Sequence, residues 1–213
     1  MSSHIDVPKQ FRQLPSVAVR AAAALPAVKG DPMGETRILM ELQRALGTKP
    51  GVLPAARGLS HFGEHALGWF ALSGLGWVTE KQQAKKREWL AMGVSAFSAH
   101  AASVILKRVV RRPRPHARGV QIGVATPSKL SFPSSHATSS TAALVSLSDI
   151  TGNPAPLVGV PVMALSRMVL GVHYPSDVAV GSVIGWATAK ATRRMMVNND
   201  EPQQPNLNNQ EKR

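Results

Sequence analysis

Residues 89–106 form the stretch that most constrains what this chain can fold into. They run for 18 residues with His100 as their only ionisable side chain. As an α-helix this stretch would be ~27 Å long, close to the ~30 Å hydrocarbon core of a bilayer. A buried helix of a soluble protein has the same signature, so the neighbouring segments must decide between the two.

Further apolar stretches lie on both sides of it, at residues 62–79, 132–148, 155–172 and 178–189. The last three are rich in Ala, Gly, Ser and Val, the small residues that membrane helices place at their contacts. Trp77 and Trp89 flank the basic loop between the first two stretches, as aromatic residues at a membrane interface often do. The pattern predicts an all-α fold: a polytopic transmembrane bundle with about five spans, embedded through residues 51–196.

The two ends of the chain are predicted to differ from this bundle. Residues 1–50 are expected to form an N-terminal amphipathic segment, in which Ile38, Leu39, Leu42 and Leu46 share one helical face. Such a helix lies either in the membrane interface or across the end of the bundle. Residues 197–213 are polar and contain proline, and we expect them to be a disordered tail.

The formal net charge of +13 indicates a polyanionic partner, which is nucleic acid, an anionic membrane surface or phosphate groups. The basic residues lie at the ends of the apolar stretches, and no nucleic-acid-binding motif is present, so we expect no nucleic-acid partner. The absence of cysteine excludes disulfides and thiol chemistry.

Three polar clusters lie at the ends of the predicted spans. The first, KRVVRRPRP at residues 107–115, offers Lys107 and Arg114 as phosphate ligands. A basic flank of a membrane helix would explain the same residues. The second, SFPSSHATSST at residues 131–141, places Ser134, Ser135 and His136 at a helix start, where free backbone N–H groups bind anions. A serine-rich helix cap with an incidental histidine is the alternative.

The third cluster is SRMVLGVHYPSD at residues 166–177. Arg167 lies near the end of an apolar stretch, and Asp177 follows His173 by four residues. If the turn brings these two together, the carboxylate can accept the Nδ1 proton and leave Nε2 as a nucleophile. Five alternating spans would put all three clusters on one membrane face, where they can form a single site.

Together the clusters resemble the three-part signature of the type 2 phosphatidic acid phosphatase family. Its Lys and Arg-Pro, separated by six residues, are met by Lys107 and Arg114. Its Pro-Ser-Gly-His is met by residues 133–136, with Ser135 in place of the usual Gly. Its Ser-Arg, His and Asp are met by residues 166–167, His173 and Asp177. A serine still supplies a backbone N–H, so we expect activity to survive this departure.

The resemblance implies an integral-membrane phosphatase that hydrolyses a lipid phosphate through a phosphohistidine, without a cofactor. In this family pattern His173 attacks phosphorus, Asp177 orients it, and His136 protonates the leaving group and then activates water. The implied phosphate ligands are Lys107, Arg114, Arg167, Ser134 and Ser135. Independently, the only carboxylates near the spans on this face are Glu64 and Asp177, and two divalent ions usually need more oxygen ligands. We therefore predict that the enzyme uses no metal.

For the substrate, RGLSHFGEHALGW and MALSRMVLGVHYPSD resemble a compact actinobacterial branch of the family. That branch is associated with decaprenylphosphoryl-5-phosphoribose, a precursor of cell-wall arabinan. Undecaprenyl diphosphate, phosphatidylglycerophosphate and phosphatidic acid are the alternative substrates. A vanadium-dependent haloperoxidase and a non-catalytic lipid-binding protein are the alternative classes.

Two expectations concern the surroundings of the site. Basic residues are more numerous on its face of the membrane, so the positive-inside rule predicts a cytoplasmic site. His61, Glu64 and His65 open the first span on the same face and are candidates for contacts with a polar part of the substrate. The sequence carries no signal for an oligomeric state.

Overall fold

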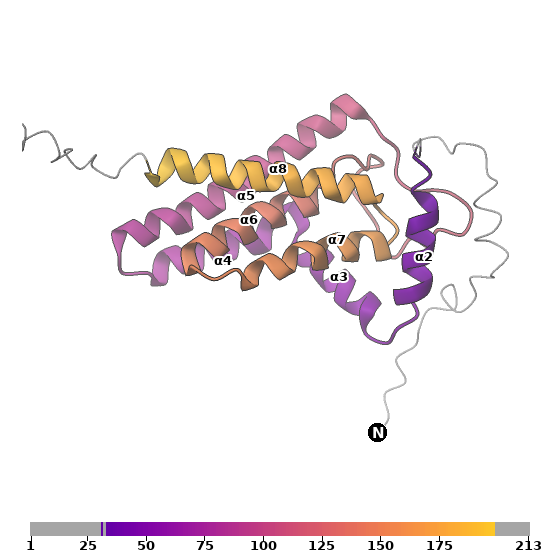
Figure 1. Cartoon of the computed structure of the whole chain (residues 1–213), viewed down its shortest axis with the longest axis horizontal. Coiled ribbons are helices and arrows are strands. Elements are labelled where there is room, and N and C mark those ends of the chain that lie inside the picture. The colour runs from indigo at the N-terminus through magenta and orange to yellow at the C-terminus, as the bar shows by residue number, and fades with distance from the viewer. Residues whose placement is uncertain (1–30, 32, 199–213) are drawn as a thin grey trace, which may run out of the picture.

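The computed structural model describes residue 31 and residues 33–198, and its regular elements there are helical, as predicted (Figure 1). They are α2 (Thr36–Leu46), α3 (Val52–Phe62), the 3₁₀ turn η2 (Glu64–Ala66), α4 (Leu67–Thr79), α5 (Gln83–Val110), α6 (Ser135–Thr151), η3 (Ala155–Val158), α7 (Gly159–Val169) and α8 (Pro175–Met196). The predictions for most of the N-terminal segment and for the tail concern residues outside this part of the chain.

Each of the apolar stretches corresponds to one of the helices α4 to α8, which run along the long axis of the molecule (Figure 1). The first stretch differs in detail, because its helix starts at Leu67 and not at residue 62. His65 and Ala66 have positive φ angles of 49° and 60°, which break the helix and separate α4 from the unpredicted α3. Judged by length and composition, α5 is the one described helix that could cross a membrane by itself.

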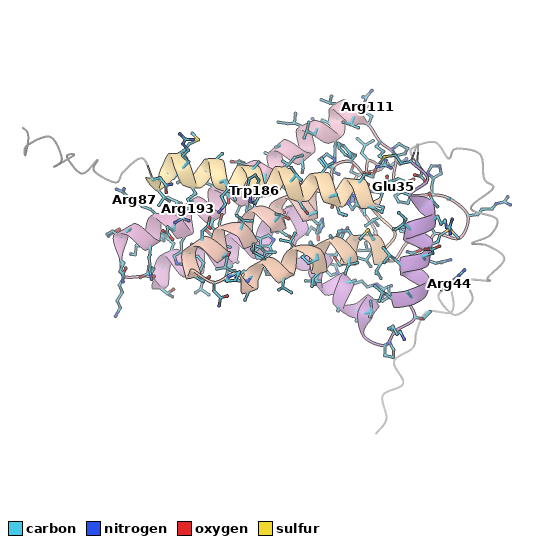
Figure 2. All side chains as sticks on the ribbon, in the orientation of Figure 1. Glu35, Arg44, Arg87, Arg111, Trp186 and Arg193 are labelled. Carbon is cyan, nitrogen blue, oxygen red and sulfur yellow. The ribbon has the colours of Figure 1, made fainter. Side chains whose placement is uncertain are left out.

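The side chains of α5 are distributed as in a helix whose outer surface contacts lipid. Its buried face is mostly small: Ala91, Ser95, Ala96, Ala99 and Ser103. Its large apolar side chains, among them Leu90, Phe97 and Ile105, are half or more exposed. On α8, Trp186 is also exposed, about midway along the bundle (Figure 2). A soluble protein of this size rarely exposes so much apolar surface.

Helix α6 packs against both α5 and α8, and glycines let α8 approach it closely. A Cβ atom at Gly185 would lie 2.2 Å from the Thr138 carbonyl oxygen, and one at Gly181 would lie 2.9 Å from the Ser134 carbonyl oxygen. Small residues four apart allow this kind of helix contact. The contact fixes the first turn of α8 beside the first turn of α6, where two of the polar clusters lie.

Helix α2 crosses one end of the bundle (Figure 1). It buries Leu39 and Met40 but exposes Ile38, so its buried face is rotated from the predicted apolar stripe. The cause is Gln43, whose side chain is also buried. Its amide donates to the carbonyl oxygens of Gln121 (2.6 Å) and Val169 (2.9 Å). Helix α2 is thereby attached to the loop after α5 and to the end of α7.

Candidate active site

The three polar clusters meet at one end of the bundle, around a cavity of about 610 Å³. Of the predicted site residues, Lys107, Arg114, Ser135, His136, Arg167 and His173 line it. Ser134 and Asp177 are fully buried behind this wall. Helices α5, α6 and α7 and the loops that follow α5 and α7 supply these residues, which are far apart in the sequence.

His173 lies in the loop between α7 and α8, with its two ring nitrogens facing different partners. Its Nε2 is 3.2 Å from a terminal nitrogen of Arg114, and its Nδ1 is 3.5 Å from Oδ2 of Asp177. At the second distance the two groups are close but make no hydrogen bond, and Nδ1 has no partner among the described residues. Burial, together with the charges of Arg114 and Arg167, holds the pKa of His173 well below its ordinary value. The ring is therefore neutral at neutral pH, as a nitrogen nucleophile must be.

The carboxylate of Asp177 is held on both sides in the first turn of α8. Oδ2 accepts from the Tyr174 backbone N–H at 2.8 Å, and Oδ1 accepts from Arg112 at 2.9 Å. These two bonds leave little freedom for the group to rotate. The two bonds therefore hold the Asp177 carboxylate in place, 3.5 Å from Nδ1 of His173.

Each of the three cations that line the cavity has a different environment. Arg114 donates to the carbonyl oxygens of Ser128 and Val172, both at 2.7 Å, and burial lowers its pKa to about 10. Lys107 donates to the carbonyl oxygens of Ser131 and Pro133, so it also shapes the loop before α6. Arg167 is 1% exposed, and its Nε and one terminal nitrogen have no hydrogen-bond partner among the described residues. A buried guanidinium with unused donors is suited to an anionic ligand.

The start of α6 presents Ser135 and not Ser134 to the cavity. Ser134 caps the helix, because its hydroxyl accepts from the Ala137 N–H and its own N–H donates to the Asp177 carbonyl oxygen. By helix geometry, the N–H groups of Ser135 and His136 have no intrahelical acceptor. The Ser135 and Ser103 hydroxyl oxygens lie 2.8 Å apart. The first turn can thus offer backbone donors and one hydroxyl to an anion.

His136 is fixed by a partner that the sequence did not reveal. Its Nε2 is 2.8 Å from the carbonyl oxygen of Ser60 on α3. Because a carbonyl only accepts, Nε2 carries a proton in this contact and Nδ1 is left as the exchangeable position. The close approach requires Gly63, where a Cβ atom would lie 2.8 Å from the His136 ring.

Two charged residues at this end of the bundle were missed, Arg112 and Glu35. One terminal nitrogen of Arg112 bonds Asp177, and the other bonds Glu35 Oε2 at 2.6 Å. Glu35 also accepts from the N–H and the hydroxyl of Ser176, at 2.6 and 2.7 Å. Burial alone would lower the pKa of Arg112, but its bonds with Glu35 and Asp177 raise it above the ordinary value.

Glu35 is a further carboxylate on this face, where only Glu64 and Asp177 were predicted. Figure 2 places Glu35 at the same end of the molecule as Arg111, opposite Arg87 and Arg193. Its carboxylate is committed to Arg112 and Ser176. The pair could not be recognised in the sequence, because Arg112 is one of several cations in a basic run and Glu35 lies 77 residues away from it.

Comparison with known proteins gives one consistent family. The family model described as the PAP2 superfamily matches residues 88–201. A protein of Mycolicibacterium smegmatis named decaprenylphosphoryl-5-phosphoribose phosphatase is 59% identical over 70% of this chain and 82% of its own length. A Mycobacterium tuberculosis protein of the same name is 54% identical over 72% of this chain and 86% of its own length.

Two solved structures share the fold. The first is the transmembrane PAP2 type phosphatidylglycerolphosphate phosphatase from Bacillus subtilis, with a TM-score of 0.63 and 18% identity, over 88% of this chain and 98% of that one. The second is LpxE from Aquifex aeolicus, with a TM-score of 0.55 and 21% identity, over 72% of this chain and 93% of that one. At these identities the likeness concerns the fold alone.

Proposed function

Because this chain belongs to the PAP2 superfamily, we propose that it is a membrane phosphatase that releases phosphate from decaprenylphosphoryl-5-phosphoribose. The substrate follows from the names of the relatives that are 54% and 59% identical. The observation that carries the chemistry is the placement of His173 at the cavity wall, between the Arg114 guanidinium and the Asp177 carboxylate.

In the proposed first step, Nε2 of His173 attacks phosphorus while the bond between phosphorus and the ester oxygen breaks. In this step His136 carries a proton on both ring nitrogens and gives the one on Nδ1 to the departing oxygen, so an alcohol leaves and not an alkoxide. Arg114, Arg167 and Lys107 offset the charge on the transferring group, with donors from the start of α6. Asp177 stabilises the positive charge that develops on the His173 ring.

In the second step, a water molecule replaces the alcohol. His136, now neutral at Nδ1, accepts a proton from this water as its oxygen bonds to phosphorus and the phosphorus–nitrogen bond breaks. The products are inorganic phosphate and free His173. A divalent ion has no part in this sequence, because the cations of the cavity would repel it and already supply the charge that it would bring.

We further propose that α4 to α8 cross the bilayer, with residues 51–196 as the membrane domain. The exposed apolar side chains of α4, α5, α7 and α8 support this, as does the fold shared with a transmembrane phosphatase. At ~1.5 Å per residue α4 is only ~20 Å long, so α3 and the turn before α4 would complete its passage.

The basic balance of the loops favours a cytoplasmic site, and the chain allows a direct test because it lacks cysteine. Gln121 is bonded to Gln43, so the exposed Arg118 is the better labelling position in the loop after α5. We expect the variant Arg118→Cys to resist an impermeant maleimide in intact cells and to react after permeabilisation. Reaction in intact cells would place the site on the outer face.

The substrate is tested by phosphate release from a lipid panel, using detergent-purified protein with and without EDTA. The panel contains decaprenylphosphoryl-5-phosphoribose, undecaprenyl diphosphate, phosphatidylglycerophosphate and phosphatidic acid. We expect kcat/KM for the first to exceed the others by about 100-fold or more, since contacts to a polar headgroup discriminate strongly. EDTA is expected to change no rate. Preference for another lipid would refute the substrate, and activity restored only by divalent ions would refute the mechanism.

A further inference from the structure

The cavity has a second wall that the proposed chemistry does not use. The cavity volume of about 610 Å³ is in the range of pockets that hold a whole small molecule, and it is larger than one phosphate group requires. The cations and the catalytic histidines occupy one part of its lining. His61, Glu64, His65 and His100 line another part.

The backbone of this wall is strained in a way that presents His65. Residue His65 and the following Ala66 both have left-handed φ angles, which residues with a Cβ seldom adopt. Such conformations persist where the surrounding structure enforces them and are frequent at functional sites. The turn brings the His65 ring to 5.9 Å from the ring of His100 on α5.

The polar groups of the wall have unused hydrogen-bonding capacity. The buried Nδ1 of His100 has no partner among the described residues. His61 and Glu64, with 76% and 50% of their side chains exposed, are 3.9 Å apart at the mouth. Imidazoles offer one donor and one acceptor each, and a carboxylate accepts several hydrogen bonds, which together match the hydroxyl groups of a sugar.

We propose that His61, Glu64, His65 and His100 form a sugar-binding subsite, which holds the hydroxyls of the pentose whose phosphate is removed. This inference rests on the proposed function and deepens it, because it assigns substrate choice to residues outside the family signature. The cationic part of the cavity binds the phosphate, and the wall formed by α3, η2 and α5 recognises what carries it.

The test uses soluble competitors, so that it does not depend on which lipid is the substrate. The enzyme hydrolyses p-nitrophenyl phosphate in the presence of one of three competitors, and the inhibition by each is measured. The competitors are inorganic phosphate, methyl ribofuranoside 5-phosphate, and the same sugar phosphate without its 2- and 3-hydroxyls. We expect the ribofuranoside to bind about 10- to 100-fold more tightly than its dideoxy analogue, which is the range for a few buried hydrogen bonds. His65→Ala, His100→Ala and Glu64→Ala should remove most of that difference and leave inhibition by phosphate unchanged.

Glu80→Ala, at the opposite end of α4, is the matched control and should keep the wild-type ratio. Equal inhibition by the two sugar phosphates in the wild type would overturn the subsite. The subsite would also be overturned if the variants weakened the inhibition by inorganic phosphate and the inhibition by the ribofuranoside phosphate to the same extent. Failure of the proposed function has a different signature, which is a preserved preference for the ribofuranoside without turnover of the ribose lipid.

Discussion

The variant His136→Ala is expected to lose about 10²- to 10⁴-fold in kcat on a lipid phosphomonoester, the usual contribution of a general acid and base. The loss should depend on the leaving group. The alcohol of a lipid or a sugar needs a proton as it departs, whereas p-nitrophenolate leaves without one. With p-nitrophenyl phosphate, the variant should therefore release nitrophenol in a burst and then stall, because water is no longer activated.

Stopped-flow absorbance measures this burst, and steady-state phosphate release measures the second step. The matched control is His116→Ala, an exposed histidine of the loop after α5 whose Nδ1 contacts the Arg114 carbonyl. A surface change of this kind should alter rates by no more than about twofold. If His136→Ala slowed the lipid and the nitrophenyl ester equally from the first turnover, its role as proton donor would be refuted.

The variant Arg112→Ala is expected to lose about 3–5 kcal/mol of folding stability, because it leaves the carboxylates of Glu35 and Asp177 buried without their cation. Glu35 and Asp177 are 7% and 0% exposed in their side chains, so water cannot replace the lost charge. Asp177 would also lose one of the two bonds that fix it. We therefore expect the folded fraction to lose activity as well, by about 10-fold or more.

Thermal unfolding in detergent and kcat of the folded fraction are the two readouts. Arg108→Ala removes an exposed cation of the same basic cluster and should change stability by about 0.5 kcal/mol at most. Arg112→Lys keeps the charge but not the fork that reaches both carboxylates, and should fall between these variants. Equal stability and equal kcat for Arg112→Ala and Arg108→Ala would show that the ion pairs do not support the site.

Local patterns in the sequence were sufficient to predict the helices from residue 67 onward, because apolar stretches of this length have few other solutions. They also predicted that the three polar clusters would lie at one end of the bundle, since antiparallel helices return every second loop to the same end. The break at residues 63–66 could not be predicted, because it depends on His65 and Ala66 adopting a rare backbone conformation. Alanine in particular seldom adopts it.

The pairing of Glu35 with Arg112 could not be predicted from the sequence either. It joins segments separated by 77 residues, and it requires α2 to cross the end of the bundle in one particular rotation. That rotation buries Gln43, a polar residue that lies four positions after Leu39, at the edge of the predicted apolar stripe. Similarly, Ser134 and Ser135 have the same side chain, and only the start of α6 decides that one caps the helix and the other lines the cavity.

The most direct test of the mechanism is to trap the phosphoenzyme and locate its phosphoryl group. His136→Ala protein is mixed with p-nitrophenyl phosphate, quenched at alkaline pH, where phosphohistidine survives, and digested for mass spectrometry. We predict phosphorylation of the peptide that contains His173, on that residue, and none in the double variant His136→Ala/His173→Ala. A phosphoryl group on another residue, or a burst of nitrophenol that persists without His173, would contradict the account.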